Sequence, residues 1–472
     1  MPTLSNENET LPFSAIPGPK GTISNILGYT FGKGTHYEKV TKRFKKFGPI
    51  YREKILDMDI VNFYDVDSLA TVLKIEANFP MRAGLEAITA VFGRNVTGIL
   101  SCDYDEWYAD RSLLSPMFLR PKEINERISM INAVANDFVE RLHHLRDQNG
   151  TIHNIERELS YWGVESNSSF LFNRRLGFYE KTPDADVLVF FEAAYKMHDN
   201  VGVLIDMGPF HKYIPTPAYY AAKRNVNTMH ESYIKLSKKR ESKSGEDPIE
   251  KTTSVADHVF AKRKLTEESL TMLCGLMAAG VDTISTTSLW LLYLLSRNPD
   301  KQEKLYQELK PFDSHEDISV NKTVSYLKAA LKESLRLHPV ASIFSRVFTQ
   351  DIELHGYHIP AGVNILFQNH LGSIDERYFG EDAKQFVPER WLRDLDTGNV
   401  KSFDPLGSLP FGHGVRMCLG RRVAEAYIYT LLSKIFIKYR VELSSKQSDV
   451  NPILNGGLMR PDREILFKFL LR

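Results

Sequence analysis

The chain has 472 residues, enough for one very large domain or for two or three ordinary ones. Its 60 basic and 59 acidic residues nearly cancel, so the total charge argues against nucleic acid as a partner. The three cysteines, at positions 102, 274 and 418, form no C-x-x-C pair, which argues against a disulfide framework and a structural zinc site.

The first fifteen residues are mostly polar and mildly acidic. They contain no apolar run near the ~18 residues that a membrane span needs, and no Arg-rich amphipathic presequence. We expect residues 1–15 to form a flexible leader that ends at the stiff turn 16–21, and residues 16–472 to form a single domain. The chain is then either soluble or preceded by a targeting segment upstream of Met1.

Two strands of a small sheet are predicted next, at 50–55 and 60–64, where apolar and charged residues alternate or β-forming residues gather. Helical periodicity then dominates from about residue 68 to residue 308. Two interruptions stand out in it. One is an aromatic, proline-broken loop at 209–217, and the other is a charged connection at 237–254 that we expect to be exposed.

The first candidate binding residues lie early in this helical region. Trp107 and Arg111 stand in W-x-x-x-R spacing, which places them about one helical turn apart on the same face. This spacing alone identifies no ligand. The spacing becomes informative only in combination with the motifs that follow it in the sequence.

A long helix is predicted from Thr266, a suitable N-cap, to Asn298, where Pro299 stops it. At about 1.5 Å per residue it spans roughly 48 Å, enough to cross a domain. It is apolar almost all round, which predicts that it is buried.

The middle of this helix is chemically unusual. The small residues 278–280 leave room for a flat group against the backbone, while Asp282 and Thr283 put an acid and an alcohol in an apolar place. The alternative is a helix-packing face of small residues, with the threonine hydroxyl bonded to its own helix.

A charged helix follows at 327–338. Lys328 and Lys332 lie four residues apart on its polar side, and Glu333 and Arg336 lie three apart on one face. Taken alone, such pairs are ordinary solvated surface contacts. Strands return at 344–348, which contains Arg346, and at 352–366, where we expect a hairpin turn at 360–362. An apolar helix is predicted at 427–437.

The most informative segment is the loop 409–420. Cys418 comes directly before a helix-forming run that starts at Arg421, where the helix dipole and unpaired backbone N–H groups stabilise a thiolate. The glycines of the loop leave space for a large flat group, and Arg416 can reach an anionic substituent on that group. These are the requirements of haem iron with a cysteine ligand. A cysteine alone is more often inert, or a nucleophile paired with a distant histidine.

The loop resembles the haem-binding signature F-x-x-G-x-R-x-C-x-G of the cytochrome P-450 superfamily, with all fixed positions matched by Phe411, Gly414, Arg416, Cys418 and Gly420. The resemblance implies a mainly α fold with small β-sheets (α+β). Haem b would lie between the long central distal helix and the proximal cysteine loop, with Cys418 as its thiolate ligand. The motifs run from Trp107 to Gly420, so the resemblance covers most of the chain.

The resemblance also implies roles for the earlier motifs. The segment 278–283 is similar to the family's A-G-x-D/E-T pattern, in which Thr283 and Asp282 handle protons during oxygen activation. Trp107 and Arg111 would bind a haem propionate. Further propionate candidates are Arg346 and Arg416.

A second set of residues would be structural by the same resemblance. In the family, the K-E-x-x-R segment forms a buried network with the arginine of a P-E-R-W motif, found here at 388–391. Glu333, Arg336 and Arg390 would therefore shape the cysteine loop without taking part in the chemistry.

The segment 417–425 and the two-lysine helix resemble the mitochondrial clan of the superfamily. That clan takes electrons from an acidic ferredoxin and its NADPH reductase, and a diflavin reductase is the alternative donor. The implied docking residues are Lys328, Lys332, Arg421 and Arg422. The resemblance also implies a mitochondrial location, peripheral to the inner membrane, with a membrane contact through 209–220. An ordinary surface loop is the alternative for that segment.

The function predicted from these motifs is a haem-thiolate monooxygenase that hydroxylates an apolar small molecule, with a steroid, sterol or secosteroid as the expected class. Segments 88–100, 276–279, 341–344 and 457–459 are expected to line its pocket. The alternatives are a haem-thiolate isomerase, which the pair Asp282 and Thr283 disfavours, and a non-catalytic haem- or sterol-binding protein.

Overall fold

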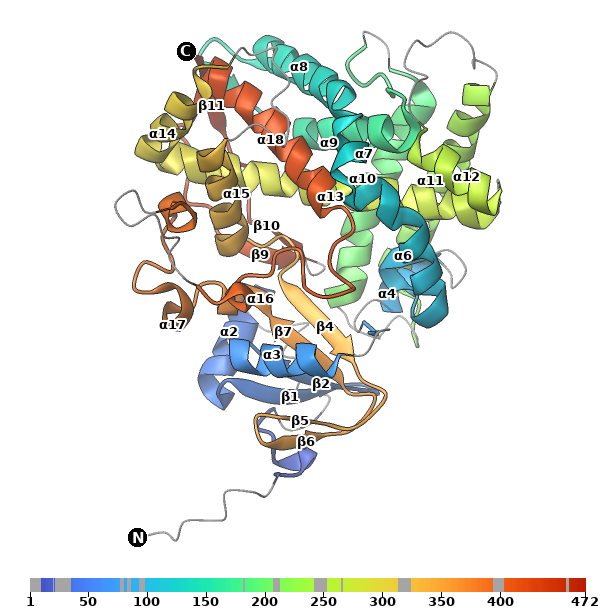
Figure 1. The fold of residues 1–472 in the computed structure, drawn as a ribbon, viewed down its shortest axis with the longest axis vertical. Helices are drawn as coiled ribbons and strands as arrows, with labels where there is room; N and C mark the ends of the chain where they lie inside the picture. The colour runs from blue at the N-terminus through green and yellow to red at the C-terminus, as the bar shows by residue number, and fades with distance from the viewer. Residues whose placement is uncertain are drawn as a thin grey trace.

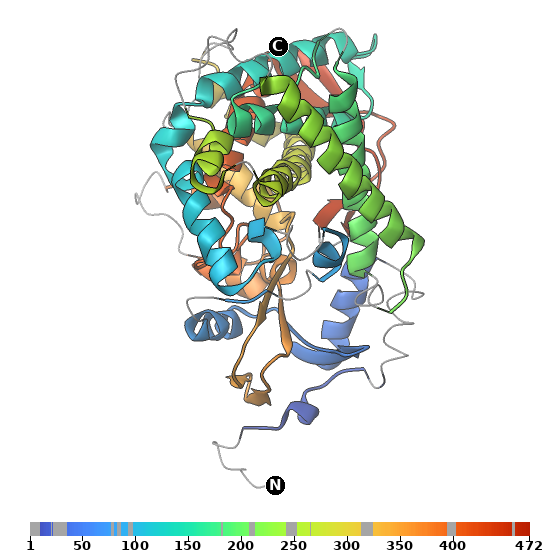
Figure 2. The ribbon, with the colours of Figure 1, turned by 90° about the vertical axis from the view of Figure 1, so that its right-hand side faces the viewer.

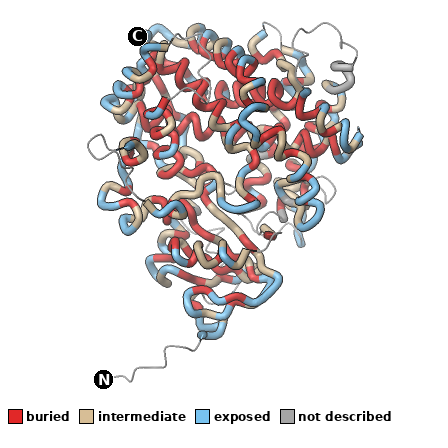
Figure 3. The backbone as a smooth tube through the Cα atoms, viewed as in Figure 1, coloured by how far each residue is buried: buried red, intermediate tan, exposed pale blue. Residues whose placement is uncertain are grey.

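Helices form most of the molecule, and a strand-rich part lies at one end of it (Figure 1). The computed structural model describes residues 10–19, 21, 35–76, 80–82, 86–92, 98–180, 183–206, 213–241, 253–264, 266–312, 324–393, 403–455 and 458–472. Buried residues run through the centre of the helical part, while the strand-rich end is more exposed at its margin (Figure 3). The prediction of a mainly α protein with small β-sheets is confirmed.

The longest element is α13 (Glu267–Arg297), which crosses the helical part and is seen almost end-on among the other helices in Figure 2. The Thr266 side chain caps it by accepting a hydrogen bond from the backbone N–H of Ser269 at 3.2 Å. Pro299 then begins α14 (Pro299–Leu309). Both predicted ends of the long helix are therefore confirmed. Among the described residues, α13 is the one helix long and apolar enough to cross a membrane, but most of that stretch is buried inside the fold.

Among the helices that pack against α13 are α9 (Ile155–Phe172), α15 (Ser325–Leu337) and α18 (Arg421–Lys438). The contact with α9 is especially close. Gly163 of α9 lies against the backbone of Val281, and Asn167 donates a hydrogen bond to the carbonyl of Met277 at 3.1 Å. A Cβ atom at Gly280 would come within 2.2 Å of the Asn167 side chain, so the glycine permits this approach.

The remaining helices complete the body. Helix α8 (Ile128–Leu145) packs on α9 and α18, and α10 (Ala185–Asp206) packs along α11 (Pro217–Glu241). The other helical segments are η1 (Phe13–Ala15), α2 (His36–Phe47), α3 (Val66–Ile75), α4 (Glu86–Phe92), α5 (Gly98–Ser101), α6 (Tyr104–Leu119), α7 (Pro121–Asn125), α12 (Val255–Arg263), α16 (Asn369–Gly372), α17 (Glu376–Phe379), η3 (Pro388–Trp391) and η4 (Pro405–Gly407).

The main sheet has the strand order β1-β2-β7-β4 and joins segments from the two ends of the sequence. β1 (Ile50–Ile55) and β2 (Met58–Phe63) pair antiparallel, and both had been predicted as strands of a small sheet. β2 runs parallel to β7 (Asn364–Gln368), which pairs antiparallel with β4 (Ile343–Val347). This arrangement brings Arg346 of β4 beside the N-terminal part of the chain.

The predicted hairpin turn at 360–362 is wrong. The hairpin joins β5 (Ile352–Leu354) to β6 (Tyr357–Ile359), and its turn is made by His355 and Gly356, both with positive φ. Such a two-residue turn matches the twist of the flanking strands. Residues 360–362 instead carry the chain from this small hairpin to β7 in the main sheet.

Two further sheets lie in the C-terminal part. β3 (Thr151–Ile152), β11 (Phe467–Leu471) and β8 (Tyr439–Leu443) form one sheet, and β9 (Pro452–Asn455) and β10 (Leu458–Pro461) form a hairpin. Leu458 of this hairpin bridges to Ala341, and the Trp290 indole donates to the carbonyl of Met459 at 3.2 Å. The hairpin is thereby fixed to α13.

Part of the predicted leader is tied to the sheets. Leu11 forms a bridge with Tyr357 of β6, and Phe13 packs into the small core beneath the main sheet. Residues 11–15 are therefore in contact with the domain, which differs from the flexible leader predicted for 1–15. Residues 1–9 lie outside the described residues.

Candidate functional site

The loop that carries Cys418 turns back on itself just before α18. Gly412 and Gly414 have φ values of 70° and 72°, which a residue with a Cβ adopts only at a cost. The backbone N–H of Cys418 donates to the carbonyl of Phe411 at 2.8 Å and closes the loop. The backbone N–H groups of Gly420 and Arg421 are directed at the Cys418 sulfur, so the start of α18 favours a thiolate there.

Cys418 is accessible to solvent although protein surrounds it. Burial is the largest influence on its thiol and raises the pKa, while the N–H groups of the helix start, Arg82 and Arg111 oppose this effect. Accessibility and strong desolvation occur together when a side chain faces an enclosed space inside a protein. The same holds on the distal side, where Ala279 is exposed although Met277, Ala278 and Val281 around it are buried.

Arginines surround the cysteine loop. Arg111 on α6 donates to the carbonyl of Met417 at 2.8 Å, and Arg82 donates to the carbonyl of Arg416 at 2.7 Å. Burial, together with the positive charges of Arg416 and Arg346, lowers the pKa of Arg82 to about 10. Sequence reasoning missed Arg82, which stands in a short segment without a recognised motif.

Arg416 is more firmly fixed than the sequence predicted. Its guanidinium donates to the carbonyls of Pro80 and Cys102 and to the Asp103 carboxylate, at 2.9, 3.0 and 2.6 Å. It also stacks over the Trp107 ring, 4.3 Å from the ring centroid. Most of its N–H groups are thus occupied by the protein, so its first role in this structure is to hold the loop against α6.

Arg346 is paired with an acid that the sequence analysis did not single out. Its Nε lies 2.5 Å from Oε1 of Glu76, and its guanidinium covers the Phe344 ring. Glu76 also touches the cysteine loop, since a Cβ atom at Gly414 would lie 2.8 Å from its carboxylate. The predicted propionate residues Trp107, Arg111, Arg346 and Arg416 are therefore brought together around one loop.

This pocket fits a haem group. Arg82, Arg111, Arg346 and Arg416 meet the acids Glu76 and Asp103, which leaves an excess of positive charge. Trp107 lies beneath the Arg416 guanidinium at the same place. Anionic propionates would balance the excess positive charge. On α13, the small side chain of Ala279 is accessible and would leave room for a flat ring.

On the distal helix, the Thr283 hydroxyl donates to the carbonyl of Ala279 at 2.9 Å. The neighbouring Asp282 is buried, and its carboxylate accepts from Nη2 of Arg460 at 2.7 Å. Nη1 of Arg460 reaches Asp199 on α10 at 3.2 Å. Asp282 thus has a cationic partner on β10, which the sequence did not predict.

The residues predicted to be structural form one buried network. Glu333 accepts from Arg336 at 2.9 and 2.8 Å, from Arg390 at 2.9 Å and from the Trp391 indole at 2.8 Å. Arg336 also binds the carbonyl of Ser373 at 2.7 Å. Arg390 also pairs with Asp382 at 3.1 Å, so two acids balance the two arginines, as buried charges require.

The cations predicted for partner docking lie on α15 and at the start of α18, two helices that pack against each other. Lys332 and Arg422 are exposed, while Lys328 and Arg421 are partly buried. Arg421 and Arg422 line a hollow of about 350 Å³ directly beside Met417 of the cysteine loop. The other lining residues are Leu119, Pro121, Ile124, Asn125 and Glu425.

The segments predicted to line the substrate pocket are described in part, and some of them contact one another. Helix α5, at the end of segment 88–100, packs on α13, and Ala341 bridges to Leu458. Residues 93–97 and Gly457 of the predicted lining lie outside the described residues.

The predicted membrane segment is described in part. Tyr213, Ile214 and Tyr220 are exposed by 59, 58 and 58%, and Tyr219 packs partly onto the core. Residues 209–212 lie outside the described residues.

Comparison with known proteins gives a consistent result. The family model described as cytochrome P-450 matches residues 16–469. Cytochrome P-450 10 of Lymnaea stagnalis is 30% identical, with 98% of this chain and 86% of that protein covered. The mitochondrial cholesterol side-chain cleavage enzyme of Ovis aries is 30% identical (97% and 89% covered). The mitochondrial 1,25-dihydroxyvitamin D(3) 24-hydroxylase of Mus musculus is 28% identical (99% and 91%).

The match to the family model agrees with the resemblance found in the sequence, as does the geometry of the site. The two relatives named mitochondrial agree with its mitochondrial branch. The chain belongs to the cytochrome P-450 family, the haem b monooxygenases that hold their iron through a cysteine thiolate.

Proposed function

We propose that this chain is a mitochondrial monooxygenase that hydroxylates a steroid, sterol or secosteroid, with Cys418 as the haem ligand and a ferredoxin as the electron donor. The observation that carries the proposal is the Cys418 thiol, accessible inside the protein at the start of α18 and surrounded by arginines. When bound, the haem supplies the activation of molecular oxygen.

The residues around the haem would divide the work. The N–H groups at the start of α18 and the charges of Arg82 and Arg111 favour the thiolate form of Cys418. Trp107 and the surrounding arginines would bind the propionates and so fix the orientation of the ring. The network around Glu333 holds α15 against the segment 379–391.

The distal pair would manage protons. Because the Thr283 hydroxyl donates to Ala279, its oxygen can accept a hydrogen bond from a group on its open side and hold that proton in place. Asp282 supplies a buried carboxylate at the next position, which can hold a proton for delivery. This pair favours monooxygenation over rearrangement of a peroxide.

The substrate class rests on the relatives and on the character of the pocket. One relative is named for vitamin D hydroxylation and another for cholesterol side-chain cleavage, and both substrates are large and apolar. Apolar residues of the predicted lining, such as Leu276, Phe344 and Leu458, suit a ligand of this kind.

The electron donor is proposed from the proximal face. Two adjoining helices carry the cations Arg421, Arg422, Lys328 and Lys332. The hollow beside Met417 adds partly apolar surface close to the cysteine loop, which a partner protein could contact. A cationic surface of this kind attracts an acidic protein such as a ferredoxin in an otherwise neutral chain. The relatives named mitochondrial support the mitochondrial location proposed here. In that compartment, ferredoxins of this kind donate electrons to members of the clan.

The thiolate is tested by one spectrum. Reduced, haem-loaded protein exposed to carbon monoxide should absorb at the thiolate-specific position, and Cys418→Ser should abolish that band. The variant Cys274→Ser is the matched control, because Cys274 is buried within α13 and should leave the band intact. A nitrogen-type spectrum in the unaltered protein would refute the assignment.

Turnover then separates the alternatives. NADPH oxidation that depends on an apolar substrate, on ferredoxin and on its reductase supports the monooxygenase. A protein that rearranges a peroxide without NADPH would be an isomerase, and one that binds sterol without either reaction would be a carrier.

A further inference from the structure

Arg460 on β10 links the distal acid to a second acidic group nearer the surface. Its guanidinium holds Asp282 at 2.7 Å and Asp199 at 3.2 Å, and its buried Nε has no acceptor among the described residues. A guanidinium has five N–H groups in a fixed fork, so Arg460 can bind another carboxylate beside these two.

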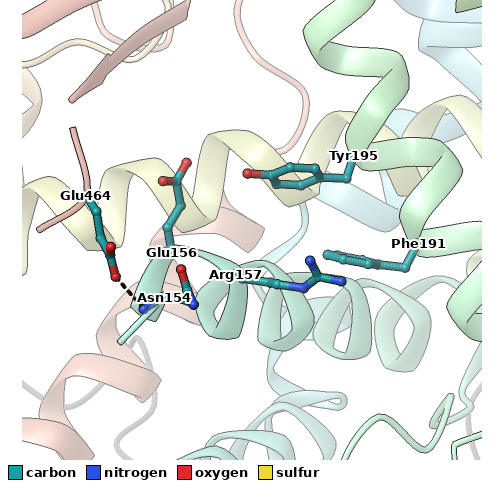
Figure 4. A pocket seen from close by; sticks show the side chains of 6 residues that line it. All are labelled: Asn154, Glu156, Arg157, Phe191, Tyr195 and Glu464. Atoms are coloured by element: carbon teal, nitrogen blue, oxygen red, sulfur yellow. Dashed lines mark hydrogen bonds between the residues drawn. The ribbon is translucent and has the colours of Figure 1, made fainter. Parts of the chain in front are cut away.

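A candidate for that carboxylate is Glu156, in the first turn of α9. It lines a cavity of about 210 Å³ together with Asn154, Arg157, Phe191, Tyr195 and Glu464. In Figure 4 the Glu156 carboxylate and the Tyr195 hydroxyl point toward each other across this cavity. Among the described residues, nothing donates a hydrogen bond to the Glu156 carboxylate.

The charges around Glu156 favour its neutral form. Burial is the largest influence and raises its pKa; Arg460 lowers it, and Asp282, Asp199 and Glu464 raise it further. From α9 itself, Arg157 also faces the cavity, but its guanidinium is engaged by Glu192 of α10 and by the Tyr161 hydroxyl. Arg460 is therefore a single cation that offsets the negative charge of several neighbouring acids.

We propose that Glu156 is the outer proton donor of the distal site, and that Arg460 follows the negative charge as a proton moves from Glu156 to Asp282. This inference rests on the proposed role of Asp282 in proton delivery. It adds the cavity of Figure 4 as the point where protons enter from solvent.

The transfer balances in protons and charge. The O–H bond of Glu156 breaks, water carries the proton past Arg460, and an O–H bond forms on Asp282; no electron moves. Arg460 keeps its own protons, because a guanidinium is not deprotonated in proteins. Before the transfer it pairs with Asp282, as observed. Afterwards it pairs with ionised Glu156 through the open Nε side, and Asp282 is released until solvent protonates Glu156 again.

The main test compares Glu156→Gln with Glu464→Gln in the haem-loaded protein. Both acids line the same cavity, but Glu464 caps α9 by accepting from the Asn154 backbone N–H at 2.8 Å, a bond that glutamine can replace. For Glu156→Gln we expect roughly tenfold less product per electron consumed, with more peroxide, a larger solvent deuterium isotope effect and a changed pH profile. Glu464→Gln removes one of the charges that raise the pKa of Glu156 but leaves the proton donor in place, so it should cause a much smaller loss.

A second measurement needs no turnover. The infrared spectrum of the resting protein should keep the band of a protonated glutamic acid to a higher pH than an exposed glutamic acid does. Isotope-labelled glutamate identifies the band, and only Glu156→Gln should remove it. Absence of that band in the unaltered protein would overturn the proposal even if the variant failed to fold.

The outcomes separate this inference from the proposed function. If Asp282→Asn uncouples the enzyme and Glu156→Gln does not, the outer donor is overturned and the role of Asp282 stands. If Asp282→Asn itself remains fully coupled, the proposed role of the distal pair fails. Arg460→Lys, which keeps the cation without the fork, should give an intermediate loss of coupling; full coupling in Arg460→Gln would contradict the role of Arg460.

Discussion

Single residues around Cys418 carry an unbalanced charge. Arg82, Arg111 and Arg346 lie with Arg416 around the cysteine loop, and the described acids that contact this group are Glu76 and Asp103. Burial lowers the pKa of Arg82, and the neighbouring arginine charges lower it further, because like charges in a poorly solvated space repel one another. A cofactor that brings two propionates supplies the missing negative charge, so haem binding and the stability of this pocket are coupled.

Replacing Arg82 by glutamine tests that coupling. Removal of one charge relieves repulsion in the haem-free protein but removes attraction for the propionates. We therefore expect little change in the stability of the haem-free protein and haem loss that is faster by roughly tenfold. Transfer of haem to an excess of apomyoglobin measures the rate.

The control for this variant is Arg440→Gln, because Arg440 is exposed on β8 and pairs only with surface Glu442 among the described residues. It should lose haem at the unaltered rate. Equal haem loss in the two variants would show that Arg82 serves only to hold the loop.

Motif residues could be found from sequence, whereas their partners could not. The motifs identified Trp107, Asp282 and Cys418 because spacing within a short segment is visible in a sequence, and the family resemblance added Arg346. Arg346 pairs with an acid 270 positions away, and Asp282 pairs with Arg460, 178 positions away. Such contacts depend on how the sheets and helices pack, which a single sequence does not encode in any local pattern.

At the scale of elements, local signals determined what could be predicted. The ends of α13 were predicted correctly because an N-cap threonine and a stopping proline act within a single turn. The hairpin at β5 and β6 was misplaced because the turn at His355 and Gly356 was overlooked beside Pro360 and Gly362. Turn residues determine where a strand ends. The strands that pair with β7 depend instead on how distant segments assemble into the main sheet.

Helices α15 and α18 provide a prediction about the electron donor. The double variant Lys328→Glu/Lys332→Glu reverses two charges on the proposed docking face. We expect ferredoxin binding to weaken by roughly tenfold or more, with the difference shrinking at high salt. Titration by calorimetry or by the haem spectrum measures it.

A matched control lies on α2. Lys42 and Lys46 are also four residues apart and exposed, but they belong to the strand-rich part of the molecule. Lys42→Glu/Lys46→Glu should leave ferredoxin binding unchanged. Equal weakening by both double variants would mean that total charge, and not a docking face, attracts the ferredoxin.

At the scale of the whole molecule, the exposed side chains at the start of α11 define the surface expected to meet a membrane. Tyr213, Ile214 and Tyr220 are each more than half exposed, and Lys223 beside them is exposed too. Apolar and aromatic side chains with a nearby lysine are suited to the interface of an anionic bilayer. This contact would bring the molecule close to where apolar substrates dissolve.

Replacing Tyr213, Ile214 and Tyr220 together by serine should weaken binding to anionic vesicles by at least roughly tenfold, since burying one such side chain is worth about 1.5–3 kcal/mol. Co-sedimentation with vesicles measures it. Leu471→Ser is the control, because Leu471 has a similar exposed fraction of 55% at the other end of the chain. Unchanged binding of the triple variant would favour the ordinary surface loop.

The C-terminal hairpin of β9 and β10 contacts both the predicted pocket lining and the distal acid. Leu458 and Met459 touch the segment at 340–341 that is expected to line the pocket, and the next residue, Arg460, neutralises Asp282. Any evolutionary change that reshapes this hairpin for a different ligand also displaces the guanidinium beside the acid. Ligand selectivity and the fraction of electrons lost to peroxide should therefore change together among relatives. Grafting a hairpin from another protein should likewise alter peroxide formation along with ligand selectivity.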